Sequence, residues 1–288
     1  MLIPLLQLAC VLTALYFLFN LYQVWRLQPG GWFGPKSIAV AVVGFVANFL
    51  DTLGIGSFAI KSAAYKQFKL VDDRLLPGTM NGQCVLATMV QALIFLGVVE
   101  VDPLTLLSMI ASAVAGAVVG ARFVAQLDRQ TVRIAMSLSL AVVALLILAG
   151  QLQLFPLGGE ATGLTGGKLL LAIAANFVWG ALMTVGVGIF APCMTTVYLL
   201  GMNPLAAFPI MMASCAMLAP FSASTFVRKQ AVDRAAVLAV AITGPIAVLL
   251  AAFLVQSLQL DTLKWLVFVV VLWTSFSMFR SYQHERVQ

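Results

Sequence analysis

The chain of 288 residues is 62% hydrophobic and only 9% charged, and its mean hydropathy is +1.05. One soluble core could not bury so many apolar residues, so the composition excludes an ordinary soluble protein and predicts a polytopic membrane protein. The net charge of +6 is spread thinly between apolar stretches. We interpret the basic residues as flanks of membrane helices and expect no nucleic-acid partner.

The cysteines and the histidine form no metal-binding or disulfide pattern. Cys10, Cys84, Cys193 and Cys215 lie in apolar surroundings without CxxC spacing, which is typical of small buried side chains. The single histidine, His284, lies in the polar C-terminal tail. We therefore expect no metal, no cofactor and no histidine proton relay inside the membrane.

Residues 1–36 are predicted to form an N-terminal transmembrane helix and a linker. The apolar run from Ile3 to Trp25 is long enough to span a hydrocarbon core of about 30 Å. It lacks the basic start and the A-x-A site of a cleaved signal peptide. The sequence RLQPGGWFGPK at 26–36 follows as a Pro/Gly linker with an interfacial tryptophan.

Beyond the linker, one unit is used twice. The stretch GFVANFLDTLGIGSFAI at 44–60 returns as NFVWGALMTVGVGIFAP at 176–192, a shift of 132 positions without a gap. The shift lays Gly54 on Gly186 and Gly56 on Gly188, and after a slip of one residue it lays Asp102 on Asp233. Internal symmetry around glycine-broken apolar segments predicts a transporter that binds its substrate at the breaks.

The repeat divides the rest of the chain. The first repeat, 37–150, contains Ser37–Leu53, a glycine break and Ser57–Leu70, and then apolar runs at about 79–99, 104–126 and 132–150. A Gly-rich connection covers 151–167. The second repeat, 168–280, has matching segments at about 168–185, 189–201, 205–227, 235–257 and 262–280, and residues 281–288 form a charged tail.

Lysine and arginine positions decide how the broken segments lie in the membrane, because cytoplasmic loops carry the excess of these residues. If each broken segment crossed the membrane, the two sides would hold eight basic residues each, whereas re-entrant hairpins place fourteen on one side and two on the other. We therefore predict an all-α integral membrane protein of two inverted repeats, each a re-entrant helix pair plus three transmembrane helices, with one extra N-terminal transmembrane helix. The expected location is the inner (plasma) membrane, with the N-terminus outside and the C-terminus cytoplasmic.

Glycines at the two breaks permit turns with positive φ and close approach of a ligand to the backbone. The helices that start near Ser57 and near Ile189 would point their N-terminal N–H groups at the centre of the bundle, which favours an anion site. The alternative is that the glycines only allow close helix packing.

Polar side chains near the breaks complete the predicted site. Asp51 is an ionisable group inside an apolar segment, which indicates either function or a structural pair with Lys61. Lys61 could attract an anion, neutralise Asp51 or extend to the interface. The predicted substrate-binding residues are Asn48, Asp51, Thr52, Gly54, Gly56, Ser57, Lys61, Thr184, Gly186, Gly188 and Thr195.

Residues 37–280 resemble the sulfite exporter TauE/SafE family, also called toluene-sulfonate uptake permeases. The resemblance is carried by the duplicated unit and by the turns GIGSFAIK at 54–61 and GVGIFAPC at 186–193. The family's turn is richer in glycine and followed by proline, and only the second copy here has that proline, Pro192. The resemblance implies a permease for a small sulfur-containing or organic anion such as sulfite, a sulfonate or sulfoacetate.

The alternative class is an integral-membrane enzyme or an assembly factor without transport activity. The sequence contains no HExxH, GxSxG or P-loop motif, so we expect no enzymatic activity and no use of ATP. A gradient would then drive transport. The expected partners are the small anionic substrate and the lipid bilayer, and the sequence leaves open whether the chain forms a homodimer.

Overall fold

The computed structural model describes residues 2–27, 34–53, 55–97, 100–152, 154, 159–254 and 276. These residues form ten α-helices, one short 3-10 helix and an isolated bridge between Ala161 and Met202, so the prediction of an all-α protein is confirmed. The helices are α1 (Leu2–Leu27), α2 (Ser37–Thr52), α3 (Ser57–Gln67), α4 (Leu76–Phe95), α5 (Pro103–Val124), α6 (Arg129–Gln151), α7 (Gly166–Met183), α8 (Phe190–Leu199), η1 (Pro204–Ala206), α9 (Ala207–Arg228) and α10 (Arg234–Leu254).

Five of the described helices are long and apolar enough to cross a membrane, namely α1, α5, α7, α9 and α10. Two helices that we predicted as spans, α4 and α6, are not among them. In α4 the reason is a set of polar side chains that the bundle buries: Thr79, Asn81, Gln83, Thr88 and Gln91. The predicted span at 262–280 and the tail at 281–288 lie outside the described residues, apart from Phe276.

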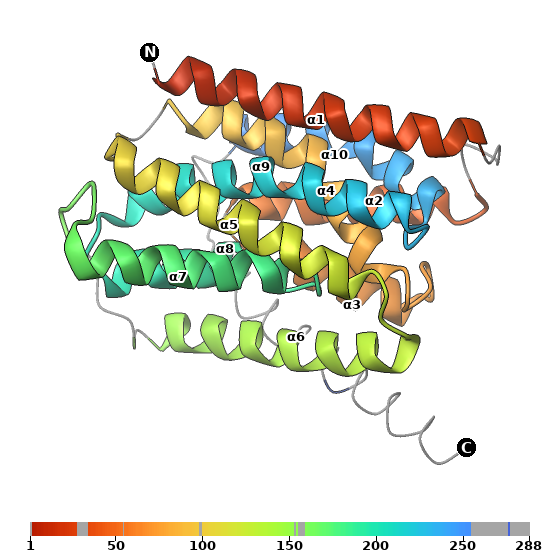
Figure 1. The fold of residues 1–288 in the computed structure, drawn as a ribbon. Coiled ribbons are helices and arrows are strands. Elements are labelled where there is room, and N and C mark those ends of the chain that lie inside the picture. Colours follow the sequence, from red (N-terminus) through yellow and green to blue (C-terminus); the bar gives the residue numbers. More distant parts are fainter. Residues whose placement is uncertain are drawn as a thin grey trace.

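Helices α4 and α9 pack against each other at the centre of the bundle and run antiparallel. The Phe95 ring at the end of α4 stacks on Phe208 at the start of α9, with 5.9 Å between the ring centroids. Near the opposite end of the pair, Ser222 Oγ donates a hydrogen bond of 2.8 Å to Asn81 Oδ1. Figure 1 shows α1 on one outer side of this pair and α6 on the opposite side of the molecule.

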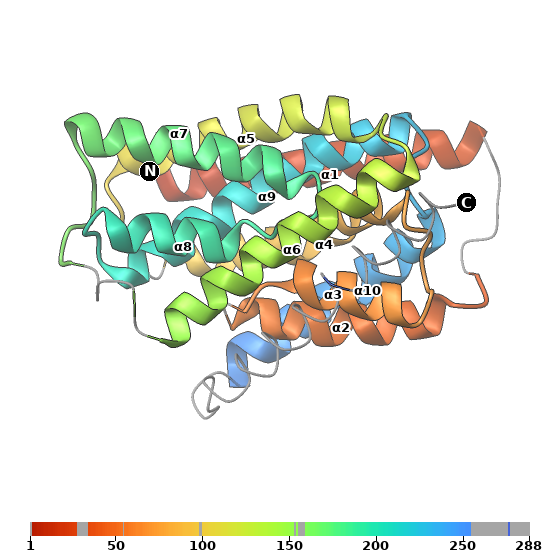
Figure 2. The ribbon, with the colours of Figure 1, turned by 90° about the horizontal axis from the view of Figure 1, so that it is seen from below.

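Glycines allow two parallel helix pairs to approach closely, α2 with α10 and α5 with α7. A Cβ added to Gly44 would lie 2.3 Å from a Val240 methyl group. A Cβ added to Gly180 would lie 2.1 Å from the Ala113 carbonyl oxygen. Small residues at helix contacts of this kind are typical of membrane bundles. Figures 1 and 2 both show α5 and α7 side by side.

Helices α2 and α3 form a hairpin, and so do α7 and α8. At the base of the first hairpin, Lys36 Nζ donates to the Lys69 carbonyl oxygen, so the chain returns to the end of the bundle at which α2 began. At the base of the second, Lys168 Nζ donates to the Leu200 carbonyl oxygen over 3.1 Å. The two bases lie at opposite ends of the bundle (Figure 2).

The tips of the two hairpins meet between those ends. A Cβ added to Gly188, just before α8, would lie 3.6 Å from the Phe58 Cβ in the first turn of α3. Residues that are 130 positions apart in the sequence (188 and 58) are thereby in contact. The breaks in both hairpins therefore face one region inside the protein.

The two hairpins share their backbone hydrogen bonds at a separation of 132 residues. Each tip has a bond that spans five residues, and each base has another. At the base, Lys69 and Gly201 both adopt positive φ, 48° and 83°, as expected at the C-terminal end of a helix. The matching bonds are Ile55 N to Leu50 O and Val187 N to Leu182 O, both 3.2 Å, and Leu70 N to Tyr65 O at 2.9 Å and Met202 N to Val197 O at 3.1 Å.

Basic side chains gather at the end of the bundle that holds the base of the first hairpin. Asp73 lies there and accepts hydrogen bonds from Lys66 Nζ at 2.7 Å and from Arg133 Nε at 2.6 Å. Lys229 Nζ donates to the Arg122 carbonyl oxygen over 3.0 Å, which brings the ends of α5 and α9 to the same region. The basic residues that these contacts and their neighbours place here are Lys36, Lys66, Lys69, Arg122, Arg133, Arg228 and Lys229.

Candidate functional site

A buried carboxylate lies at the tip of the first hairpin. Asp51, in the last turn of α2, is 3% exposed. Its Oδ1 accepts the backbone N–H of Ser57 over 2.5 Å, and its Oδ2 accepts a hydrogen bond of 3.0 Å from Gln91 Nε2 of α4. The carboxylate therefore ties together three helices, α2, α3 and α4.

Gly56 makes this contact possible. It precedes α3 with φ 89° and ψ 123°, a conformation that L side chains rarely adopt. The chain can then reverse between α2 and α3, so that the first N–H of α3 faces the last turn of α2. A negative charge at a helix N-terminus is favourable, and here the protein supplies that charge itself. We predicted that the α3 N-terminus would be free for a ligand, and for the Ser57 N–H this was wrong.

Lys61 is the buried cation of the site. Its side chain is 0% exposed, and its Nζ donates a hydrogen bond of 3.1 Å to Asn48 Oδ1 of α2. It forms no ion pair with Asp51 within 4.0 Å and does not reach an interface. An ammonium group has three donors, and among the residues that the structure describes only the neutral Asn48 amide accepts from it.

Two polar atoms next to this cation and this carboxylate have no partner. Asn48 Nδ2, a donor, and Gln91 Oε1, an acceptor, are both buried without a hydrogen bond. Leaving such a group unsatisfied costs about 1–3 kcal/mol, so each one calls for an explanation. A ligand that accepts from Asn48, or a change of protonation beside Gln91, would satisfy them.

Thr52 and Gln91 join the two parts of the site. The Thr52 hydroxyl donates to the Asn48 carbonyl oxygen over 3.0 Å and accepts a bond of 3.1 Å from Gln91 Nε2. We name the residues Asn48, Asp51, Thr52, Ser57, Lys61 and Gln91 the tip network. Sequence reasoning missed Gln91, although a glutamine in the middle of the apolar run 79–99 was the available signal.

The second hairpin contributes differently from its prediction. Thr184 Oγ1 donates to the Ala181 carbonyl oxygen over 2.6 Å, and Thr195 Oγ1 donates to the Ala191 carbonyl oxygen over 2.9 Å. Both hydroxyls therefore bond to their own helices and have no hydrogen bond to the tip network. The structure brings together Asn48, Asp51, Thr52, Ser57 and Lys61, but it does not bring these two threonines to them.

The turn glycines also differ from one another. Gly186 has positive φ, 117°, and a Cβ there would lie 3.1 Å from the Met136 methyl group. Gly188 does not have positive φ, so its prediction as a turn glycine of that kind was wrong. Around Gly56 nothing lies within 4 Å of an added Cβ, which contradicts a pure packing role at this position. Gly54 lies outside the described residues.

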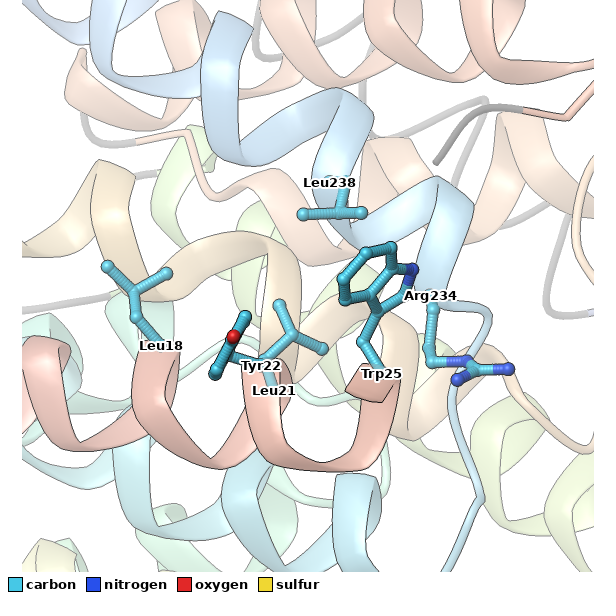
Figure 3. A pocket seen from close by; sticks show the side chains of 6 residues that line it. All are labelled: Leu18, Leu21, Tyr22, Trp25, Arg234 and Leu238. Carbon is cyan, nitrogen blue, oxygen red and sulfur yellow. The ribbon is translucent and has the colours of Figure 1, made fainter. Parts of the chain in front are cut away.

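A separate pocket of about 160 Å³ lies between α1 and α10 (Figure 3). Its lining is mostly apolar and contains no residue of the tip network. It is formed by Leu18, Leu21, Tyr22, Trp25, Arg234 and Leu238. In the part of the chain that the structure describes, no group of three or more His, Cys, Asp or Glu residues could hold a metal ion.

Comparisons with protein-family models, with curated proteins and with solved structures gave no match to this chain. The resemblance stated above therefore stays a prediction, and function has to be argued from the tip network and its surroundings.

Proposed function

We propose that this protein is a secondary membrane transporter for a small anion, a sulfur-containing or organic acid such as sulfite, a sulfonate or sulfoacetate. The observation that carries the proposal is the Lys61 ammonium group, fully buried beside the region where two hairpin tips meet and bonded only to a neutral amide. A buried cation without a paired anion is costly, and a substrate anion would supply the missing charge. The unpartnered Asn48 Nδ2 offers the same anion a second donor.

The hairpins support re-entrant segments in the membrane. Each returns to the end at which it began, closed by a lysine of one helix and a carbonyl oxygen after the other, at Lys36 and at Lys168. Non-helical backbone at membrane depth is tolerated only where protein buries it or where it lines a polar cavity. Tips that meet inside the bundle satisfy that condition and place broken helices around a central site, as in many secondary transporters.

Two inverted repeats are supported by contacts that correspond between the halves. Gly44 lies against Val240, and their sequence equivalents, Asn176 at +132 and Met109 at −131, are joined by a hydrogen bond of 2.8 Å. Asn48 lies against Gly244, and their equivalents, Gly180 and Ala113, also face each other. The equivalent helices α4 and α9 run antiparallel, which is the relation expected of inverted halves.

The orientation follows from the basic end. Cytoplasmic loops carry the excess of lysine and arginine, so we assign the end with Lys66, Arg122 and Lys229 to the cytoplasm. The opposite end holds Lys168 and the loop at 100–102. Helix α1 ends near the basic side, because Arg228 bonds to Asn20 at 2.7 Å, and its N-terminus is therefore assigned to the outside.

The proposal is tested by flux into proteoliposomes. Purified protein should take up at least one labelled anion from a panel of sulfite, thiosulfate, sulfoacetate, taurine, sulfate and methanesulfonate, in response to the anion gradient. The variant Lys61→Met, which keeps the length of the side chain but removes its charge, should lose most of that uptake. Absence of flux for every anion, together with turnover of a lipid or peptide substrate in detergent, would instead favour a membrane enzyme.

A further inference from the structure

We propose that Asp51 binds one proton for each monovalent anion that the site takes up, so that the protein is an anion–proton symporter. This inference rests on the proposed function and adds the coupling ion to it. It follows from the hydrogen bonds of the tip network and from its charges.

The first argument is that Asp51 already occupies the place of an anion. Its carboxylate accepts the Ser57 N–H at the start of α3, which is where a bound anion would be most stabilised by the helix. A substrate anion that takes this N–H must displace the carboxylate. Displacement is far easier once the carboxylate has lost its charge.

The second argument is charge balance. The tip network contains one cation, Lys61, and one anion, Asp51, and both are buried. A monovalent substrate would leave a net charge of about −1 in a low-dielectric region, which is unfavourable. A proton on Asp51 restores neutrality, because the remaining pair is the ammonium group of Lys61 and the substrate.

The third argument is the unpartnered acceptor. Gln91 now donates through Nε2 to the Asp51 carboxylate, while its Oε1 is buried without a donor. A protonated Asp51 needs an acceptor for its new O–H. Rotation of the Gln91 amide by about 180° turns Oε1 toward Asp51, and the nearby Thr52 hydroxyl tolerates either orientation because a hydroxyl both donates and accepts. Gln91 therefore suits both protonation states.

No other group near Asp51 does this work. The titratable side chains closest to it and to Lys61 are Cys84 of α4 and Cys215 of α9, and a thiol is neutral at pH 7. Helix α10, which packs on α2, presents Val240 and Thr243 to it. Asp51 is thus the group that changes charge.

The step itself is a simple proton transfer. Water on the side of entry gives a proton to Asp51, an O–H bond forms on the carboxylate, and hydroxide remains in the bulk buffer. On the other side Asp51 returns the proton to water and the anion leaves unchanged. Nothing is oxidised or reduced, and no bond of the substrate breaks.

The test uses the full-length protein in detergent and methanesulfonate as the probe, because this anion stays ionised throughout the pH range used. Calorimetric titration in two buffers with different ionisation enthalpies gives the number of protons taken up per anion bound. We expect about one proton for the wild type and none for Asp51→Asn, which still binds. The control Asp128→Asn changes an exposed carboxylate outside the network and should keep one proton per anion.

Flux measurements complete the test. In proteoliposomes, an inward proton gradient should accelerate methanesulfonate uptake by the wild type several-fold and leave uptake by Asp51→Asn unchanged. Binding without proton uptake in the wild type would overturn the symport inference and leave the transporter proposal standing. No binding and no flux for any anion of the panel would overturn both.

Discussion

At the scale of single residues, the tip network differs from an ordinary buried polar cluster. In a purely structural cluster of this size we would expect Lys61 to be paired with Asp51 and every amide atom to be satisfied. Instead the two charges have different neutral partners, Asn48 for the cation and Gln91 for the carboxylate. Arrangements that leave charges separated and buried are typical of sites that wait for another charged group.

Lys61 is expected to control anion affinity. Its ammonium group would make a charge-assisted hydrogen bond to the substrate, and such a bond contributes about 1.5–3 kcal/mol. Lys61→Met should therefore weaken anion binding about 10- to 100-fold. Thermal stabilisation of the purified protein by the transported anion measures this.

Lys66→Met is the matched control for that experiment. Lys66 lies on the same helix, but it pairs with Asp73 at the basic end. Its loss should change anion binding by less than about twofold. Equal weakening in both variants would show that Lys61 acts only through the stability of α3.

The residues of the first hairpin were predictable, and those of the second were not, for a physical reason. Asp51 and Lys61 are ionisable groups within apolar segments, so their cost alone singles them out. Thr184 and Thr195 are hydroxyls, which can bond to the preceding turn of their own helix, and both do so. Gln91 was missed because a single amide in an apolar run has no such cost to distinguish it.

At the scale of elements, the two turns show how one repeated sequence supports different local structures. The backbone bonds across the tips correspond at +132, as between Ile55 and Val187, yet positive φ occurs at Gly56 in one tip and at Gly186 in the other. Those two glycines are 130 residues apart, not 132. The duplication could be read from the sequence, but which glycine carries the strained conformation depends on packing across the molecule.

Alanine at Gly56 and at Gly188 should therefore have unequal effects. Gly56→Ala places a Cβ at φ 89°, at a cost of about 1–3 kcal/mol, and should disturb the contact between Asp51 and Ser57. Gly188→Ala meets only an ordinary contact of 3.6 Å and should change stability by less than about 1 kcal/mol. Thermal unfolding in detergent checks the pair. Equal destabilisation would contradict the assigned backbone conformations.

Asp73 holds α3, the following loop and α6 together at the basic end. Burial acts to raise the pKa of Asp73, but hydrogen bonds and charges from Lys66 and Arg133 outweigh it and hold that pKa below its usual value. The folded pKa is thus depressed. This stabilisation is present above the ordinary aspartate pKa of about 3.9 and is lost as the pH falls through the folded value.

Asp73→Asn should for this reason lower the stability at neutral pH by about 1.5–3 kcal/mol, because hydrogen bonds to a charged group are lost. Thermal unfolding of wild type and variant should differ at about pH 7 and converge well below pH 4. Glu160→Gln, at an exposed carboxylate of the opposite end, is the control and should follow the wild type at both pH values. A gap that persists at acid pH would mean that Asp73 acts by shape and not by charge.

At the scale of the whole molecule, the sequence predicted an all-helical chain and the positions of its helices to within a few residues, because apolar length and Pro/Gly breaks mark them directly. It did not predict that α4 would be too polar to pass as a span. The polar residues of α4 face its neighbours and not lipid, and only the packing of α4 against α9 reveals that. The basic end is a property of the same packing, since Lys61 was counted with that end but lies buried between the ends.

The sidedness of the molecule is the last expectation, and it follows from which residues share an end. The loop that contains Val101 lies with the base of the second hairpin, because the neighbouring Asp102 N–H donates to the Thr162 carbonyl oxygen over 2.9 Å. Gln130 lies at the start of α6, one turn from Arg133 and its bond to Asp73. If the basic end is cytoplasmic, Val101 is external and Gln130 is internal.

Single cysteines at these two positions test that assignment. The four native cysteines are buried and can be replaced to give a cysteine-free background. On intact cells a membrane-impermeant maleimide should label Val101→Cys at once and label Gln130→Cys only after the membrane is opened. The opposite pattern would invert the assigned orientation. Labelling of both positions from one face would mean that the chain between them, which contains α5, does not cross the membrane, and the inverted-repeat arrangement would then be untenable.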